Sequence, residues 1–422
     1  MDISNEKVLI ISHNPLSAVN NNGKTLASIF DGLPEKNIYQ IYLNSENPDY
    51  SDSITYLQIN ERQIIESLIK CKNVCCKEVN GNPEQLSATI IKRLNFANHI
   101  KRLIREGIWK TSIWKLRLKE WLKDKKFDVV FFMAGDGLFA YDIYRFVIHN
   151  TSAKKCLFFT DDYILGASSV SPVALLRRFL LRIKMKNTLN ETDELYVISD
   201  EMREAYREIF GMDGYVIRNF SVEIINGEIS NSCDENDHLK MVYAGGLHYN
   251  RWKVLEKIAN ELKKVNDTNS VKCLLEIYSA QNIPQKILDR LNVEGVSRFM
   301  GGATASQIAG IYAASDILVH VESFDKKAIA STKYSFSTKI PEYMSAGKCI
   351  LAIGPSEVSS MKYLMNCACT ITDEKTIFSS LNEIVSNKHY RDIKVSACKN
   401  RYEQDFSREK QKECLERILG LS

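Results

Sequence analysis

Residues 337–353 read STKIPEYMSAGKCILAI, which predicts a polar loop, a short helix over 341–346, a glycine that ends it, and a buried strand over 349–353. A loop that opens a helix presents backbone N–H groups and the positive end of the helix dipole. That geometry suits an anion such as a diphosphate, and Glu342 on the first turn could accept hydrogen bonds from sugar hydroxyls. The same spacing fits an ordinary strand–helix connection equally well.

The rest of the chain repeats this alternation of apolar strands and helices in two series. The predicted strands of the first series are residues 7–12, 38–43, 128–133, 156–160 and 195–198. Those of the second series are 241–244, 274–278, 296–300, 317–321, 349–353 and 368–371. Short buried strands between helices are typical of parallel sheets. The fold class is therefore α/β, with two Rossmann-like doubly wound domains.

Domain boundaries follow from a polar stretch at residues 226–238, NGEISNSCDENDH, which we interpret as a linker. The predicted domains are 1–222 and 238–400, and we expect the C-terminal helix within 401–422 to pack back on the first domain. A chain of 422 residues is long enough to bury two cores. Ligands of doubly wound sheets bind at the carboxyl ends of the strands, so we expect a cleft between the two domains.

Composition indicates a cytoplasmic protein. No apolar run approaches the roughly 20 residues that span a bilayer, and the polar start of the chain is unlike a signal peptide. The 11 cysteines show no disulfide framework, and the cluster of Cys71, Cys75 and Cys76 lacks the further ligands of a zinc site. We interpret these thiols as structural.

Two basic stretches lie in the first half of the chain, at residues 99–126 and 171–186. The first carries Trp109, Trp114 and Trp121. In the second, Ser171 and Pro172 predict a helix start, and an apolar stripe follows among bases. The stripe is Val173, Leu176, Leu180 and Ile183, and the bases are Arg177, Arg178, Arg182, Lys184 and Lys186. These features predict peripheral contact with an anionic membrane; the alternative is domain helices with solvated basic faces. No nucleic-acid reading motif accompanies them, so we expect no nucleic-acid partner.

Five segments together resemble a known family. They are KVLIISHNP (7–15) followed by Asn22-Gly23-Lys24, YVISDEMREAYREIFG (196–211), YVIRNF (215–220), YAGGLHYNR (243–251) and SFSTKIPEYMSAGKCILAIGP (335–355). In this order they resemble the retaining GT-B glycosyltransferases of family 4, which build bacterial capsule, O-antigen and other surface polysaccharides. The resemblance implies retaining transfer from a UDP- or GDP-linked sugar, without metal or cofactor. The implied acceptor is a saccharide, which the membrane interpretation places on a polyprenyl diphosphate at the inner membrane face.

The resemblance also implies a set of donor-binding residues: Asn22, Gly23, Gly246, Arg251, Ser337, Thr338, Lys339 and Glu342. This chain departs from the family at several of them. Gly246 stands where an arginine is usual, which leaves Arg251 as the expected cation for the diphosphate, with Lys339 as its substitute partner. Of two family glutamates only Glu342 remains, and either Tyr334 or Glu322 takes the position of the first.

Candidate catalytic residues are Arg251 and three acids that follow predicted strands, Asp136, Asp161 and Asp162. An acid at a strand end could orient the acceptor hydroxyl, although aspartate is also a favoured helix cap. The alternative function on this fold is a nucleotide-sugar 2-epimerase, which would return a nucleotide with an altered sugar. We expect Glu342→Ala and Arg251→Ala to abolish transfer and to leave the fold intact.

Overall fold

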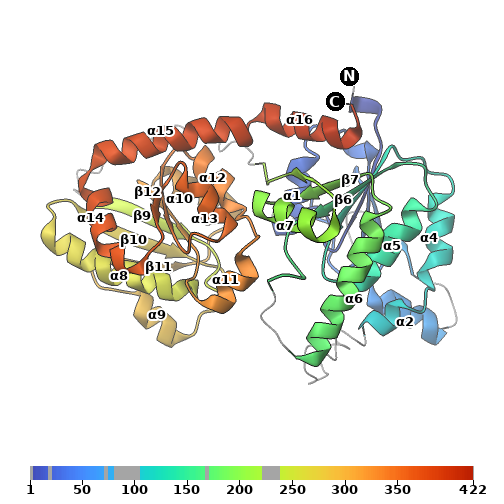
Figure 1. The fold of residues 1–422 in the computed structure, drawn as a ribbon, viewed down its shortest axis with the longest axis horizontal. Coiled ribbons are helices and arrows are strands. Elements are labelled where there is room, and N and C mark those ends of the chain that lie inside the picture. Colours follow the sequence, from blue (N-terminus) through green and yellow to red (C-terminus); the bar gives the residue numbers. More distant parts are fainter. Residues whose placement is uncertain are drawn as a thin grey trace. The chain divides into compact units, whose positions relative to one another are not determined.

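The computed structural model describes residues 3–17, 21–70, 75–79, 105–166, 171–220 and 238–421. The chain forms two compact units (Figure 1). Unit 1 is Met1–Arg218 with Gln411–Ser422, and unit 2 is Asn219–Lys410. The predicted linker lies outside the described residues, except for His238, which begins the first strand of unit 2. Cys71 and the start of the first basic stretch, residues 99–104, also lie outside them.

Unit 1 is built on an eight-stranded sheet in the order β4-β3-β2-β1-β5-β6-β7-β8. Its strands are β1 (Val8–Ser12), β2 (Ile38–Tyr42), β3 (Thr55–Gln58), β4 (Lys77–Val79), β5 (Val129–Ala134), β6 (Lys154–Phe159), β7 (Glu194–Val197) and β8 (Tyr215–Val216). The pairings are parallel except that β4 runs antiparallel to β3. All side chains of the central strands β1 and β5 are buried, as their apolar sequences VLIIS and VVFFMA predict.

Helices provide the crossovers that parallel strands require. In unit 1 these are α1 (Asn21–Ile29), α2 (Glu61–Lys70), α4 (Trp114–Leu122), α5 (Leu138–Ile148), α6 (Pro172–Leu189) and α7 (Asp200–Phe210). A further helix, α16 (Arg408–Leu419), packs on unit 1 from the C-terminal end of the chain (Figure 1). Its Gln411 donates to the carbonyl oxygens of Ile29 and Asp31 at 3.2 and 2.7 Å, and Lys154 donates to the Arg417 carbonyl at 2.7 Å.

Unit 2 contains a six-stranded, wholly parallel sheet in the order β11-β10-β9-β12-β13-β14. The strands are β9 (His238–Ala244), β10 (Lys272–Tyr278), β11 (Ser297–Gly301), β12 (Ile317–Val321), β13 (Cys349–Ile353) and β14 (Cys369–Ile371). The helices are α8 (Arg251–Thr268), α9 (Gln285–Leu291), α10 (Ala305–Ala313), α11 (Lys326–Thr332), α12 (Lys339–Ser345), α13 (Ser359–Met365), α14 (Ile377–Ser386) and α15 (Lys388–Asp405).

The predicted α/β class with two Rossmann-like sheets is confirmed. In each sheet the first strand of the unit has later strands on both sides, so the strand order reverses between β1 and β5 and between β9 and β12. Loops that leave two adjacent parallel strands at such a reversal diverge to opposite faces and leave a crevice between them. These two points are therefore where the functional side chains of each unit are expected.

Candidate functional site

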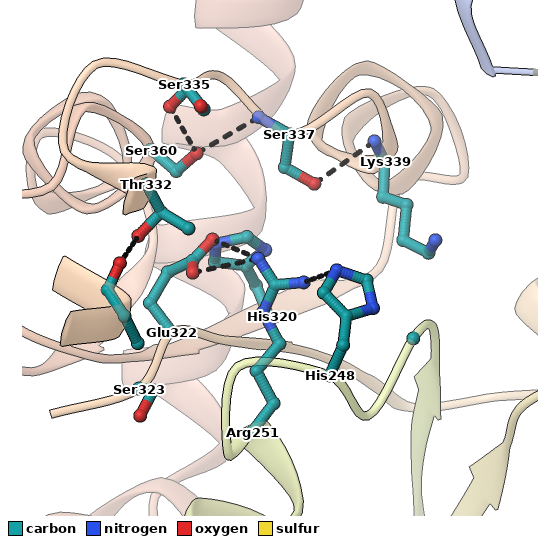
Figure 2. A network of polar contacts seen from close by, with 12 residues as sticks. His248, Arg251, His320, Glu322, Ser323, Thr332, Ser335, Ser337, Lys339 and Ser360 are labelled. Atoms are coloured by element: carbon teal, nitrogen blue, oxygen red, sulfur yellow. Dashed lines mark hydrogen bonds and ion pairs between the residues drawn. The ribbon is translucent and has the colours of Figure 1, made fainter. Parts of the chain in front are cut away.

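In unit 2 a polar network lies where β9 and β12 end (Figure 2). The glycines 245 and 246 follow β9, Arg251 begins α8, and Glu322 directly follows β12. Because β9 and β12 are paired neighbours, the side chains beyond their carboxyl ends are brought together. Lys339, the first residue of α12, enters the same region.

Arg251 is held by a buried carboxylate. Its Nη2 donates to both carboxylate oxygens of Glu322, at 3.1 and 2.9 Å, and its Nη1 lies 3.3 Å from His248 Nε2 (Figure 2). Glu322 is only 3% exposed, and His320 Nε2 lies 3.4 Å from its Oε1. Burial alone would raise the pKa of Glu322, but Arg251 and then His320 outweigh it and hold the pKa below its usual value. Glu322 is therefore ionised, and it balances the charge of Arg251.

This pairing changes the prediction for Arg251. The sequence suggested a guanidinium available to a diphosphate, whereas the structure places it against a buried carboxylate. Arg251→Ala is accordingly no longer expected to leave the fold intact, because the buried carboxylate of Glu322 would lose the guanidinium that balances its charge. Of the two residues considered for the first acidic position, Glu322 is the one beside Arg251. Tyr334 lies after α11, with the Lys333 ammonium 5.3 Å from its ring centroid.

The two glycines after β9 make room for neighbouring side chains. A Cβ on Gly245 would lie 3.3 Å from Cε of Lys339, so the lysine passes directly over bare backbone. A Cβ on Gly246 would lie 2.5 Å from Nδ1 of His248, so the imidazole fills the space beside Gly246. Burial, then Arg251, and more weakly Lys339 lower the pKa of His248, which favours the neutral ring near neutral pH.

The loop before α12 offers fewer backbone donors than the sequence suggested. The Ser337 N–H donates to Ser360 Oγ at 3.0 Å, and the Lys339 N–H points to Ser337 Oγ at 3.4 Å (Figure 2). Thr338 caps the helix without a side-chain hydrogen bond. Glu342 is half-buried on the first turn. Burial raises the pKa of Tyr312, and Tyr343 and the nearby Glu342 carboxylate raise it further. Two backbone N–H groups of this loop are therefore already directed to side-chain hydroxyls.

In unit 1 a pocket of about 110 Å³ opens where β1 and β5 end. Its polar lining comes from His13, Asn14, Asn22, Asp136 and Tyr163, together with the backbone of Gly135 and Gly137. The predicted candidates Asn22 and Asp136 thus share one pocket. Two of its residues, His13 and Tyr163, carried no assigned role in the sequence prediction. His13 followed a predicted strand, but nothing in the spacing connected Tyr163 to Asp136.

Asp136 is held by a basic helix. Arg177 Nη1 on α6 lies 3.3 Å from Asp136 Oδ2, and Nη2 donates to the Asp136 carbonyl. The Arg177 side chain is 13% exposed and also faces Glu106 at 3.9 Å. Burial raises the pKa of Tyr163, and the charges of Asp161 and Asp136 add to this effect, so both acids lie near its hydroxyl. The ion pair fixes one side of Asp136 while its carboxylate still lines the pocket.

The position of the His13 ring is fixed by contact with an arginine. Arg105 Nη2 lies 3.1 Å from His13 Nε2, and Arg105 also pairs with Glu61. Trp109 Nε1 donates to the same Glu61 carboxylate at 3.0 Å. Burial, and then the charge of Arg105, lower the pKa of His13, so its ring is expected to be neutral at pH 7. The pocket therefore combines one carboxylate with neutral amide, imidazole and phenol groups.

Two predicted site residues have structural explanations instead. The Asp162 carboxylate accepts from the backbone N–H groups of residues 164–166 and from the Tyr206 hydroxyl at 3.2 Å, which holds the loop after β6. A Cβ on Gly23 would lie 2.5 Å from the Pro15 carbonyl oxygen, so glycine is required where α1 packs on the preceding loop. Both residues thus have structural contacts, and their roles in catalysis and donor binding stay predictions.

No protein-family model matches the sequence, and the search of curated proteins gives no match. Solved structures do match in fold. A trehalose-6-phosphate synthase from E. coli bound with UDP-2-fluoro glucose has a TM-score of 0.65 at 9% identity, covering 99% of this chain and 100% of the other. HepE from Anabaena in complex with UDP and glucose has a TM-score of 0.61 at 12% identity, with coverages of 98% and 99%. WaaG, a glycosyltransferase of lipopolysaccharide biosynthesis, has 0.57 at 14%, with coverages of 98% and 100%. This chain therefore has the two-domain α/β fold of GT-B glycosyltransferases.

The buried pair predicts a large stability effect. Glu322→Gln is expected to lower the free energy of unfolding by about 3–5 kcal/mol, because Arg251 becomes an uncompensated buried charge. Chemical denaturation monitored by circular dichroism measures this loss. The control is Glu374→Gln, which breaks a solvent-exposed ion pair with Lys257 and should cost less than about 1 kcal/mol. Equal stability of Glu322→Gln and the wild type would contradict the pairing.

The same pair has a pH signature. Because the pKa of Glu322 is lowered in the folded protein, its contribution is full above the ordinary value of 4.5 and is lost as pH falls through the lowered pKa. The stability difference between the wild type and Glu322→Gln should therefore be constant near neutral pH and shrink in acid. A difference that grew as the pH fell would refute the assignment.

Proposed function

We propose that this protein is a glycosyltransferase that moves a sugar from a UDP- or GDP-linked donor to a saccharide acceptor. The observation that carries the proposal is the presence of two cations where β9 and β12 end: Arg251, paired with Glu322, and Lys339, which lies beside Gly245. Two cations beside bare backbone at the reversal of a doubly wound sheet suit a nucleotide diphosphate. Fold neighbours bound with UDP-2-fluoro glucose and with UDP and glucose support such a donor.

On the donor side, charge grows on the diphosphate as the bond from the anomeric carbon to the phosphate oxygen breaks. Lys339 and Arg251 would stabilise that charge, and preorganised cations are effective because they need no rearrangement during the reaction. Glu322 keeps Arg251 ionised and fixes its orientation. Arg251 would therefore orient the diphosphate by directed hydrogen bonds, and Lys339 would add a second positive charge. Glu342 would accept hydrogen bonds from sugar hydroxyls.

On the acceptor side, the pocket of unit 1 would bind the sugar that is extended. Its neutral imidazole and amides suit hydroxyl groups, and Asp136 would orient the attacking hydroxyl. In the retaining reaction that the family resemblance implies, the acceptor oxygen bonds to the anomeric carbon. Its proton passes to the departing phosphate. This route uses no metal or cofactor, and Asp161 would act by its charge on Tyr163, which lines the pocket.

The finer parts of the proposal concern the biological setting. The family resemblance suggests a saccharide carried on a polyprenyl diphosphate, synthesis of capsule, O-antigen or exopolysaccharide, and work at the inner face of the membrane. Among the described residues, no helix is both long and apolar enough to cross a bilayer. Contact with the membrane would therefore have to be peripheral for the part of the chain that the structure describes.

Product analysis tests the reaction class. Incubation with UDP- and GDP-sugars and a saccharide acceptor should release the free nucleoside diphosphate and a lengthened saccharide, measured by mass spectrometry. A nucleotide that is retained with an altered sugar would favour the 2-epimerase instead. If neither donor type binds, as measured by a shift of the melting temperature, the proposed function fails.

Lys339→Ala should lower kcat/KM for the donor by about 100-fold, as expected for removing a group that stabilises charge in the transition state. Lys339→Arg should retain most of the activity because the positive charge remains. Lys257→Ala, on the surface of α8, is the matched control and should stay within about twofold of the wild type. Full activity of Lys339→Ala would show that this lysine does not stabilise charge on the diphosphate.

Asp136→Asn should lower kcat by roughly 100-fold and leave binding of the donor unchanged, because the acceptor hydroxyl loses its charged partner. Asp142→Asn is the control, since Asp142 on α5 pairs with Lys184 on α6, as Asp136 pairs with Arg177 on α6, but does not line the pocket. Steady-state kinetics and donor calorimetry separate the two effects. Weaker donor binding with normal kcat would contradict a role on the acceptor side.

A further inference from the structure

Helix α6 exposes a continuous apolar face. Its buried side chains, Leu181, Met185, Thr188 and Leu189, lie toward its C-terminal half, whereas its N-terminal end projects away from the sheet of unit 1 (Figure 1). The exposed apolar side chains are Val173 (37%), Leu175 (50%), Leu176 (58%), Phe179 (62%), Leu180 (41%) and Ile183 (42%). At about 100° per residue these six fall within roughly 160° of the helix circumference, so they form one face. We call it the α6 face.

Such a face is unusual on a protein surface. Single exposed apolar side chains are common, but a contiguous group of this size marks a site of interaction. The helix is well formed in spite of it, since Ser171 accepts from the Ala174 N–H as the predicted cap. The exposed face is therefore a property of an ordered helix that is anchored along its opposite side.

The charged side chains of α6 itself are all positive. The helix contains five Arg and Lys residues and no Asp or Glu. Two of them are directed inward, Arg177 to Asp136 and Lys184 to Asp142. Arg182 and Lys186 are exposed, and by helical position they lie along one edge of the α6 face. The outward surface thus combines a broad apolar strip with a cationic border.

The tryptophans of the other basic stretch do not extend this surface. Trp109 and Trp114 are each 2% exposed and belong to the core of unit 1. Trp121 donates to the Glu78 carboxylate at 2.6 Å. The expectation of a membrane contact is therefore wrong for Trp109 and Trp114, whereas for the partly exposed Trp121 it stays a prediction.

We propose that the α6 face binds a lipid bilayer that contains anionic headgroups. Leucine and phenylalanine on one side of a helix with arginine and lysine at its border match the boundary between acyl chains and phosphates. The long basic side chains can reach the headgroups while the apolar ones enter the bilayer. A second copy of this chain fits less well, because pairing two α6 faces would bring cationic borders together without any acid from either helix.

The position of α6 connects the proposed membrane contact to the pocket of unit 1. Arg177 on the inward side of α6 holds Asp136, which lines the pocket of unit 1. The helix proposed to contact the bilayer is thus joined by an ion pair to a residue that lines the pocket. An acceptor carried on a lipid would require the pocket to lie near the membrane in this way. The binding itself does not depend on the transferase reaction, because it is measured without donor or acceptor. Failure of one proposal is therefore distinguishable from failure of the other.

The test is cosedimentation of the full chain with vesicles at low salt, using phosphatidylcholine alone and phosphatidylcholine with about one third phosphatidylglycerol. The wild type should bind the anionic vesicles and should be released as the salt concentration rises. Leu176→Ser/Phe179→Ser should bind at least about tenfold more weakly, because two apolar groups are lost from the contact. Arg182→Gln/Lys186→Gln should lose the preference for anionic lipid.

The matched control is Met300→Ser/Ile393→Ser, which removes two side chains of similar exposure, 41% and 52%, from unit 2 and should bind as the wild type does. Melting temperatures of all variants should be equal within a few degrees, since each substituted side chain is exposed. The proposal is overturned if the wild type does not bind anionic vesicles or if the α6 variant binds them equally well. It is also overturned if the α6 variant only dissociates a dimer, as measured by sedimentation equilibrium.

Discussion

The ion pair between Arg251 and Glu322 sets the charge that unit 2 would present to an anion where β9 and β12 end. Two parallel strands that are adjacent in the sheet end beside each other, which brings a helix-starting arginine to a carboxylate that is almost fully buried. The guanidinium is thereby charged, oriented and largely neutralised before any ligand arrives. A second cation, Lys339, lies nearby, and a Cβ on Gly245 would be 2.8 Å from the Tyr243 hydroxyl oxygen and 3.3 Å from Lys339 Cε.

Unit 1 repeats the same construction with different chemistry. Its strand order also reverses beside the first strand, and a pocket lies at that point. Arginines again hold polar side chains of the site in place: Arg105 contacts His13, and Arg177 forms an ion pair with Asp136. The lining that results is neutral apart from one carboxylate, which suits hydroxyl groups rather than phosphates. One fold thus places two cations at the sheet edge of unit 2 and a largely neutral polar pocket at that of unit 1.

The sequence predicted most of the fold because central parallel strands are continuous apolar runs, such as β1, β5 and β13. It missed the short strands β3 and β8, of four and two residues, and β4, whose KEV is mostly exposed. It also missed α15, which buries only Cys398 and Tyr402 and so lacks an apolar stripe. The site was harder to predict because it depends on pairs far apart in the chain. The family resemblance could indicate Arg251 and a place after a strand could indicate Asp136, but neither could show that Glu322 and Arg177 pair with them.

The central claim is that a nucleotide diphosphate binds at the carboxyl end of the β9 and β12 strands of unit 2. A crystal structure of the protein with its UDP- or GDP-sugar tests this most directly. We expect diphosphate oxygens within hydrogen-bond distance of Lys339 Nζ and of the Arg251 guanidinium, with Glu322 still paired to Arg251. A diphosphate bound elsewhere on the chain, with Lys339 directed to solvent, would contradict it.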